Sequence, residues 1–208
     1  APVQNVGAYG QEIVQVLDSV LAYDLKEEKY VTIKKEDMKL GYRSSIFNHG
    51  EDAGRYLIIS MTIHLSHDTL TPPFYTSLQN YVEEHQITDF SPKSIREMVT
   101  EIRWSKLPKP EEMASSGSFF KNVYLDDAEA DRLRGMNVPV WEGNKVPSGW
   151  LIDHAGLKGM VFHGMRVSEK AALILINESA QSYAHLKQAR EEIVSIIEKK
   201  YGLTLQQE

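Results

Sequence analysis

The chain has 208 residues, of which 42% are hydrophobic, and a formal net charge of −6 at pH 7. This composition is typical of a globular protein with a sizeable core, and the acidic balance argues against a nucleic-acid partner recognised through a general basic field. The absence of cysteine excludes disulfides, zinc–thiolate centres and thiol catalysis, and no apolar run approaches the roughly 18 to 20 residues of a membrane span.

The first half of the chain predicts a β-rich region followed by a helix. Residues 19–34 carry two β-favouring runs around a polar turn, which predicts a hairpin. Residues 56–65 place apolar side chains at alternate positions and predict a strand. Ser91 and the proline after it are typical of a helix start, and the segment 106–110 ends that helix. We place the boundary between two domains after residue 107.

The second half predicts three helices and a buried strand. Residues 126–136 and 148–156 are typical of short helices, and 182–201 of a long helix ended by Gly202. The apolar run within 171–177 does not alternate, which indicates a strand buried on both faces. Because strands and helices mix without a βαβ rhythm, the predicted fold class is α+β.

Several residue patterns suggest chemistry only weakly. His64 and His67 are spaced as a pair of metal ligands, but a third ligand at a fixed spacing is absent, so surface histidines and no metal are favoured. Ser118 is not surrounded by the G-x-S-x-G pattern of hydrolases, which argues against a nucleophile. The sequence also lacks the glycine-rich fingerprints of dinucleotide-binding and P-loop proteins.

Three basic or aromatic features suggest an anion site. Arg43 lies between two aromatic residues and is either an exposed turn residue or a guanidinium held ready for a carboxylate or phosphate. Lys106 is either a lysine that complements a helix dipole or a ligand-binding cation. Phe119 and Phe120 lie inside the polar stretch GSFFKN, where they could anchor a loop whose polar residues face a cleft.

Six segments occur together in an order and spacing that resemble the UDP-N-acetylenolpyruvoylglucosamine reductase family (the MurB family), type I-like in the loop after the long strand. They are QNVGAYG at 4–10, GYRSSIF at 41–47, SKLPKP at 105–110, GSFFKN at 117–122, SGWLIDHAGLKG at 148–159 and ALILIN at 172–177. The resemblance implies that 1–107 is the carboxy-terminal part of a PCMH-type FAD-binding domain. It implies that 108–208 is a smaller α+β substrate-binding domain with a catalytic segment at its end.

The activity implied by the resemblance belongs to bacterial peptidoglycan precursor synthesis in the cytoplasm. NADPH reduces FAD, and the reduced flavin gives a hydride to C3 of UDP-N-acetylglucosamine enolpyruvate. Protonation at C2 then yields UDP-N-acetylmuramate. Family members carry a further FAD-binding region before the QNVGAYG segment, so we expect this stretch to be inactive alone. A monomer is expected, with no nucleic-acid or membrane partner.

The resemblance also assigns roles to single residues. The implied catalytic residues are Arg43 for the enolate carboxylate, Ser118 as the proton donor and Glu208 as its assistant. The implied substrate-binding residues are Tyr75, Lys106 and Asn122, and the implied cofactor-binding residues are Val3, Gly7, Ala8 and Ile58.

Some positions differ from the family pattern. The family's Glu-Pro-Glu is Gln-Gln-Glu at 206–208 here, the proline after SFFKN is Val123, and a frequent substrate-side glutamine is Ala171. Two other readings therefore stay open. The chain could be a UDP-sugar binding module without flavin, or an α+β interaction domain in which these segments serve packing.

Overall fold

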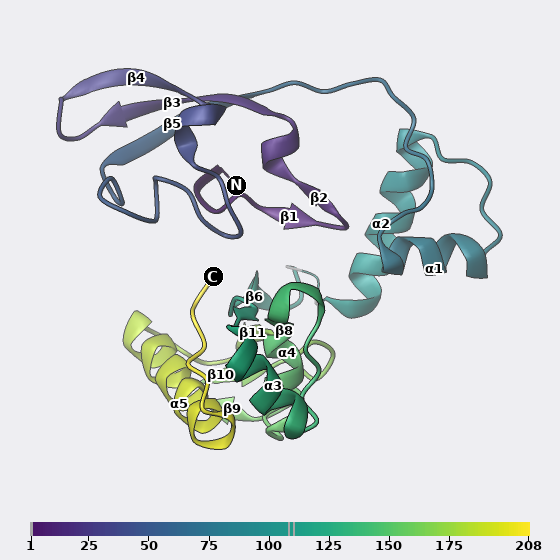
Figure 1. Cartoon of the computed structure of the whole chain (residues 1–208), viewed down its shortest axis with the longest axis vertical. Helices are drawn as coiled ribbons and strands as arrows, with labels where there is room; N and C mark the ends of the chain where they lie inside the picture. Colours follow the sequence, from purple (N-terminus) through teal and green to yellow (C-terminus); the bar gives the residue numbers. More distant parts are fainter. Residues whose placement is uncertain (1, 108, 110) are drawn as a thin grey trace. The chain divides into compact units, whose positions relative to one another are not determined.

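The computed structural model describes residues 2–107, 109 and 111–208, and it divides into two compact units (Figure 1). The first unit comprises Ala1–Ile102 and the second comprises Arg103–Glu208. Both units contain helices and antiparallel strands, which confirms the α+β class. The boundary expected from the sequence, after residue 107, lies a few residues further along the chain.

The first unit contains a three-stranded antiparallel sheet in the order β4-β3-β5 and a small ribbon. The strands are β1 (Gly7–Ala8), β2 (Gln11–Glu12), β3 (Leu17–Asp24), β4 (Lys29–Lys34) and β5 (Tyr56–Ile63), and the 3-10 turns are Pro2–Gln4, Ile13–Gln15 and Lys35–Met38. The β3–β4 pair confirms the hairpin predicted for 19–34, and β5 confirms the strand predicted within 56–65.

The sheet of the first unit has an uncovered edge. Its core is formed by six buried side chains, which are Leu17, Val20, Ala22, Ile33, Met38 and Phe47. Along the edge strand β5, by contrast, Leu57 and Ile59 remain 54% and 57% exposed, and Met61 is 44% exposed. The apolar positions that predicted this strand are therefore largely uncovered within the first unit.

Two helices follow the sheet of the first unit. They are α1 (Thr76–Glu84) and α2 (Pro92–Lys106), and they share a small core of Leu78, Val82, Met98 and Ile102. The end of α2, from Arg103, belongs to the second unit. Helix α2 begins as predicted, because the Ser91 hydroxyl accepts a hydrogen bond from the backbone N–H of Ser94 at 3.3 Å. Helix α1 was not predicted from the sequence.

The second unit is built on a four-stranded antiparallel sheet in the order β6-β11-β10-β9, beside a two-stranded ribbon of β7 and β8. Its strands are β6 (Ala114–Ser118), β7 (Val123–Tyr124), β8 (Lys145–Val146), β9 (Val161–Phe162), β10 (Met165–Val167) and β11 (Ile174–Asn177). Its helices are α3 (Asp127–Gly135), α4 (Ser148–His154) and α5 (Tyr183–Tyr201), with a 3-10 turn at Glu142–Asn144.

The core of the second unit joins the sheet to helix α5. Ile174, Leu175 and Ile176 are all buried, which confirms the prediction of a strand covered on both faces. Helix α5 buries Ile193 and Ile197 completely, and it ends as predicted at Gly202, whose φ of 70° is the left-handed conformation that glycine adopts without a Cβ clash.

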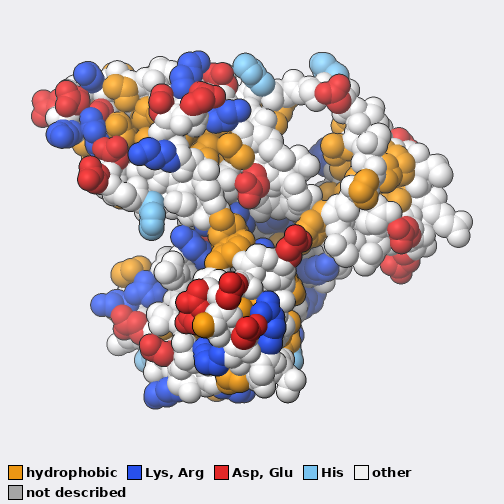
Figure 2. Space-filling model, in the orientation of Figure 1, with side chains coloured by type: hydrophobic (Ala, Val, Ile, Leu, Met, Phe, Trp, Pro, Cys, Tyr) orange, Lys and Arg blue, Asp and Glu red, His pale blue; other side chains and the backbone are white. Residues whose placement is uncertain are grey.

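The surface carries charges of both signs. On the face shown in Figure 2, lysine and arginine side chains are interspersed with aspartate and glutamate side chains rather than gathered in one basic patch. Among the described residues, none of the helices has the length and apolar character that crossing a membrane requires.

One ion pair joins the end of β3 to the residue before β5. Asp24, at the end of β3, accepts two hydrogen bonds from Arg55, from Nε at 2.9 Å and from Nη2 at 2.6 Å. Its carboxylate also accepts the backbone N–H groups of Lys26 and Glu27, at 2.9 and 3.2 Å, in the β3–β4 turn. The Arg55 guanidinium lowers the pKa of Asp24 from 3.8 to about 2.

We expect Asp24→Asn to destabilise the protein near neutral pH and to lose its effect in acid. Because the pKa of Asp24 is lower in the folded state, its ionised form stabilises the fold above about pH 4, and this contribution is lost as the pH falls toward 2. Urea midpoints of parent and variant should converge between about pH 7 and pH 2.5. Glu28→Gln controls for charge removal in the same turn, and a pH-independent difference for Asp24→Asn would contradict this cause.

Candidate functional site

The segment GSFFKN begins in a strand, because Gly117 and Ser118 are the last residues of β6, and its other residues lie outside the named strands. Ser118 pairs with Ile174 of β11, which corrects the loop expected at this position. Phe119 and Phe120 are only 6% and 1% exposed, and their rings pack edge to face with centroids 5.0 Å apart. The expectation that the two phenylalanines anchor this segment is therefore confirmed.

The carboxy-terminal residues lie along the same segment. The backbone N–H of Glu208 donates to the carbonyl oxygen of Phe119 at 2.9 Å. The backbone N–H of Lys121 donates to the carbonyl oxygen of Gln206 at 2.8 Å. Phe120 and Gln207 form the antiparallel bridge between these two bonds. The structure thus places the backbone of Glu208 opposite Phe119, the residue that follows Ser118.

Asn122 has a structural contact that the sequence did not reveal. Its Oδ1 accepts the backbone N–H of Ser148 at 3.1 Å, at the start of α4. The buried Ser148 hydroxyl in turn donates to the carbonyl oxygen of Lys121 at 2.6 Å. Helix α4 and the GSFFKN segment therefore hold each other in place, and one oxygen of Asn122 is already used inside the protein.

A lysine lies between two exposed aromatic rings on the β7–β8 ribbon, whose first strand follows this segment. The Lys145 ammonium lies 5.9 Å from the ring centroid of Tyr124 and 5.7 Å from that of Trp141. The two rings are 51% and 53% exposed. Sequence reasoning missed this cluster, because only the pairing of β7 with β8 brings Tyr124 beside Lys145.

Arg43 and the glycine-containing ribbon come together in the first unit. The guanidinium Nη2 of Arg43 donates to the carbonyl oxygen of Gly7 at 3.2 Å and lies over the Tyr42 ring at 5.3 Å. The backbone of Arg43 has a left-handed φ of 50°, and its carbonyl oxygen accepts a hydrogen bond from Asn48 Nδ2 at 3.2 Å. A buried residue, Asn5, bonds both Glu12 and the carbonyl oxygen of Gly41, at 2.8 and 3.2 Å, and so ties the two loops together.

The remaining predicted residues of the first unit surround this ribbon or support it. The Tyr75 ring is 54% exposed and packs edge to face on Tyr9, with centroids 6.2 Å apart. Ala8 is exposed, whereas Val3 and Ile58 pack against the sheet core. Lys106 is the exposed last residue of α2, at the start of the second unit.

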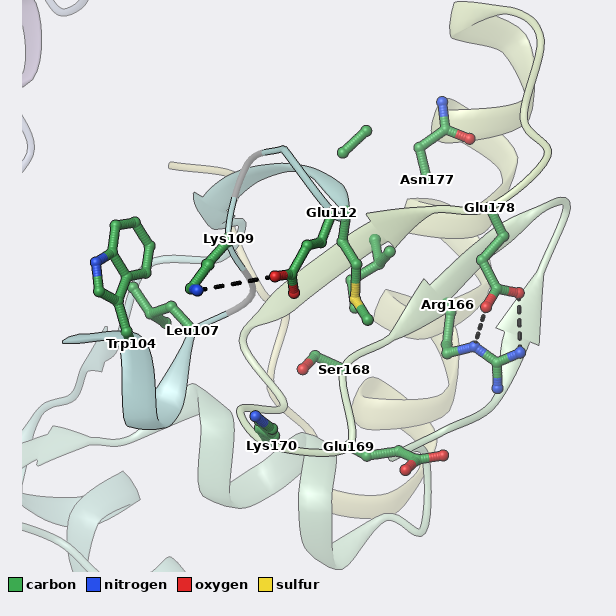
Figure 3. A pocket seen from close by; sticks show the side chains of 13 residues that line it. Trp104, Leu107, Lys109, Glu112, Arg166, Ser168, Glu169, Lys170, Asn177 and Glu178 are labelled. Atoms are coloured by element: carbon green, nitrogen blue, oxygen red, sulfur yellow. Dashed lines mark hydrogen bonds and ion pairs between the residues drawn. The ribbon is translucent and has the colours of Figure 1, made fainter. Parts of the chain in front are cut away.

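A cavity of about 750 Å³ lies near the other end of β6 from Ser118 (Figure 3). Ala114, Ile176 and Asn177 line it, and two ion pairs lie in its wall. Lys109 Nζ is 3.9 Å from Glu112, and Arg166 and Glu178 point toward each other with a second contact of 2.9 Å between Nη2 and Oε2.

The charges of this cavity offset one another. The Arg166 guanidinium lowers the pKa of Glu178 and also donates to the carbonyl oxygen of Gly159 at 2.9 Å, so Arg166 is used within the protein. A wall of paired charges has little excess attraction for a diphosphate, and we place the candidate site at the Ser118 end of β6 instead. The residues that the structure describes contain no group of three His, Cys, Asp or Glu side chains suited to a metal ion.

Comparison with known proteins finds relatives of this chain. Residues 109–208 match the family model of the UDP-N-acetylenolpyruvoylglucosamine reductase C-terminal domain. The reductase of that name from Idiomarina loihiensis is 35% identical over 100% of this chain and 62% of its own length, and that from Aliivibrio fischeri is 33% identical over 100% and 60%. The chain thus spans about three fifths of these relatives.

The fold agrees with these sequence matches. The crystal structure of UDP-N-acetylenolpyruvylglucosamine reductase from Thermus caldophilus superposes with a TM-score of 0.59 at 18% identity, over 100% of this chain and 58% of that one. The resemblance of the chain to the UDP-N-acetylenolpyruvoylglucosamine reductase family is therefore confirmed.

We expect Asn122→Ala to destabilise the protein by about 1 kcal/mol, because it leaves the Ser148 N–H without the acceptor that the structure gives it. Thermal unfolding of the variant and the parent measures this effect. Gln188→Ala, on the exposed face of α5, is the matched control and should change stability little. Equal melting temperatures for Asn122→Ala and the control would show that this contact contributes nothing to the fold.

Proposed function

We propose that this chain, which resembles UDP-N-acetylenolpyruvoylglucosamine reductases along its whole length, supplies the substrate-binding and part of the flavin-binding machinery of such an enzyme. The reaction is the NADPH-driven, FAD-dependent reduction of UDP-N-acetylglucosamine enolpyruvate to UDP-N-acetylmuramate in the bacterial cytoplasm. The observation that carries the proposal is the Glu208–Phe119 backbone hydrogen bond, which pairs the segment that carries Glu208 with the segment that carries Ser118.

The first unit has features that suit a flavin. Ala8 is exposed on the ribbon, and Arg43 adds a cation beside Gly7. Val3 and Ile58 would support this wall from the core side. The uncovered apolar side chains on β5 support the view that this unit is the remainder of a PCMH-type FAD-binding domain, because such surfaces mark contacts with further protein. FAD, when bound, supplies the hydride.

Arg43 would act on the negative charge that develops in the reaction. Hydride addition to the enolpyruvyl group leaves an enolate conjugated with the substrate carboxylate, and a fixed guanidinium binds such a group through two parallel hydrogen bonds. The contacts to Gly7 and the Tyr42 ring hold the Arg43 side chain before substrate arrives, so little reorganisation is needed.

Ser118 would donate the proton to C2 of the enolate. A serine hydroxyl is a weak acid, so the transfer needs a strongly basic enolate beside it and a rigid donor. Pairing with Ile174 and the burial of Phe119 and Phe120 supply that rigidity. The Glu208 carboxylate, at the adjacent position on the paired tail, would assist the proton transfer.

The uridine diphosphate would bind along the β7–β8 ribbon. Exposed aromatic rings such as Trp141 stack on a base, and Lys145 beside them offers charge to a phosphate. Asn122 precedes this ribbon directly, and Tyr75 and Lys106 are proposed to complete the substrate contacts. We propose that the enzyme works as a monomer.

Ser118→Ala and Arg43→Lys test the proposed chemistry in the complete protein. We expect NADPH to reduce the flavin at the parent rate in both variants, whereas reoxidation by the enolpyruvyl substrate slows by roughly 10² to 10⁴-fold. Stopped-flow absorbance of the flavin separates the two half-reactions. Parent-like reoxidation in both variants would remove these residues from the chemistry, and a parent that binds UDP-N-acetylglucosamine but no flavin would favour the non-catalytic binding module.

Trp141→Ala tests the proposed base platform. Loss of one stacking ring should weaken binding of UDP by roughly 5 to 100-fold, with the rate of flavin reduction by NADPH unchanged. Isothermal titration calorimetry with UDP measures the affinity. Tyr30→Ala is the matched control, because Tyr30 is also a well-exposed aromatic residue but lies on β4. Equal UDP affinity in the two variants would place the base elsewhere.

A further inference from the structure

The segment that carries Glu208 is held to the protein by a very short ladder. Its backbone makes hydrogen bonds to the GSFFKN segment at Gln206 and at Glu208. Two backbone bonds are weak protection against local opening, since short exposed ladders fray readily. The buried side chains of Leu203 and Leu205 anchor the chain before this ladder.

Gln207 occupies the position between the two ladder bonds. Because those bonds involve the residues on either side of it, the backbone N–H and C=O of Gln207 take no part in the pairing with Phe120. Its side chain instead reaches helix α5, where Nη1 of Arg190 donates to Gln207 Oε1 at 2.8 Å. This side-chain bond attaches the segment to α5 independently of the ladder.

Arg190 is well placed to serve as a fixed anchor. It follows Ala189 on α5 and precedes Ile193, both of which are completely buried, so the helix cannot shift locally without disturbing the core. The Arg190 side chain is 25% exposed, and its other contact, between Nη2 and Glu191 at 3.8 Å, is long. Of these two contacts of Arg190, the hydrogen bond to Gln207 is therefore the stronger.

We propose that Arg190 and Gln207 are positioning residues that hold the segment carrying Glu208 on the GSFFKN segment. This inference rests on the proposed function, in which the Glu208 carboxylate assists proton donation by Ser118. Without the Arg190 contact, the ladder opens more often, and the carboxylate leaves the position from which it can act. The proposed site assigns neither residue a substrate contact, so the expected effect falls on turnover rather than on substrate affinity.

The first test removes the anchor and follows the ladder directly. In Arg190→Ala, amide hydrogen exchange of Glu208 and Lys121, read by NMR, should accelerate about tenfold, while amides in the helix core keep their protection. Turnover of the complete protein should fall roughly ten- to hundredfold, with KM for the enolpyruvyl substrate within about twofold of the parent. Lys187→Ala is the control, because Lys187 pairs with the same Glu191, at 3.8 Å, without contacting the ladder.

The second test restores the order of the segment by another route. Proline at 207 fixes φ and lacks only an N–H that the pairing does not use, so Arg190→Ala combined with Gln207→Pro should recover most of the turnover and slow the exchange of Glu208. Recovery in both readouts supports the positioning role. A double variant that is as impaired as Arg190→Ala overturns it.

The failure of this inference is distinguishable from that of the proposed function. A parent protein whose flavin is not reoxidised by the enolpyruvyl substrate would overturn the proposed reaction and, with it, the catalytic purpose of the anchor. An active parent with exchange and turnover matched by Arg190→Ala would overturn the anchor alone.

Discussion

The burial of Phe119 and Phe120 is the constraint on which the second unit depends. Two adjacent residues on a regular strand face opposite sides, so burying both requires protein on each side of the segment. Strand β11 accompanies the segment on one side, and the carboxy-terminal tail pairs with its continuation. The residues before and after the two rings are thereby fixed, which is why Ser118 and Asn122 have defined neighbours rather than lying in a mobile loop.

In the first unit, too, a buried contact fixes backbone that carries predicted site residues. Asn5 is almost completely buried and bonds to both the ribbon and the loop that carries Arg43. These bonds fix the conformation of irregular backbone, as strand pairing does in the sheets. Each unit thus presents polar groups from backbone that is held by buried contacts. Proton transfer to one carbon atom benefits from this rigidity, because small displacements of the donor lower the rate.

The sequence predicted those parts of the fold that depend on local signals. Helix α2 has a capping serine and proline, α5 has a regular apolar stripe, and β11 has a non-alternating apolar run, and each was found where expected. Strand β6 was missed because Ala-Ser-Ser-Gly-Ser has little intrinsic strand preference and becomes a strand through pairing with residues far along the chain. The contact of Asn122 with Ser148 and the Tyr124–Lys145–Trp141 cluster were missed for the same reason, since tertiary pairing creates them.

The uncovered edge of the first unit has a practical consequence for work with this stretch of protein. Within the described part of the chain, β5 pairs with β3 and carries the exposed side chains of Leu57, Ile59, Met61 and Ile63. Edge strands of this kind can pair with strands of other molecules, and charged or proline residues usually prevent this. We therefore expect residues 1–208, purified on their own, to be prone to intermolecular strand addition, and Ile59→Lys to reduce it.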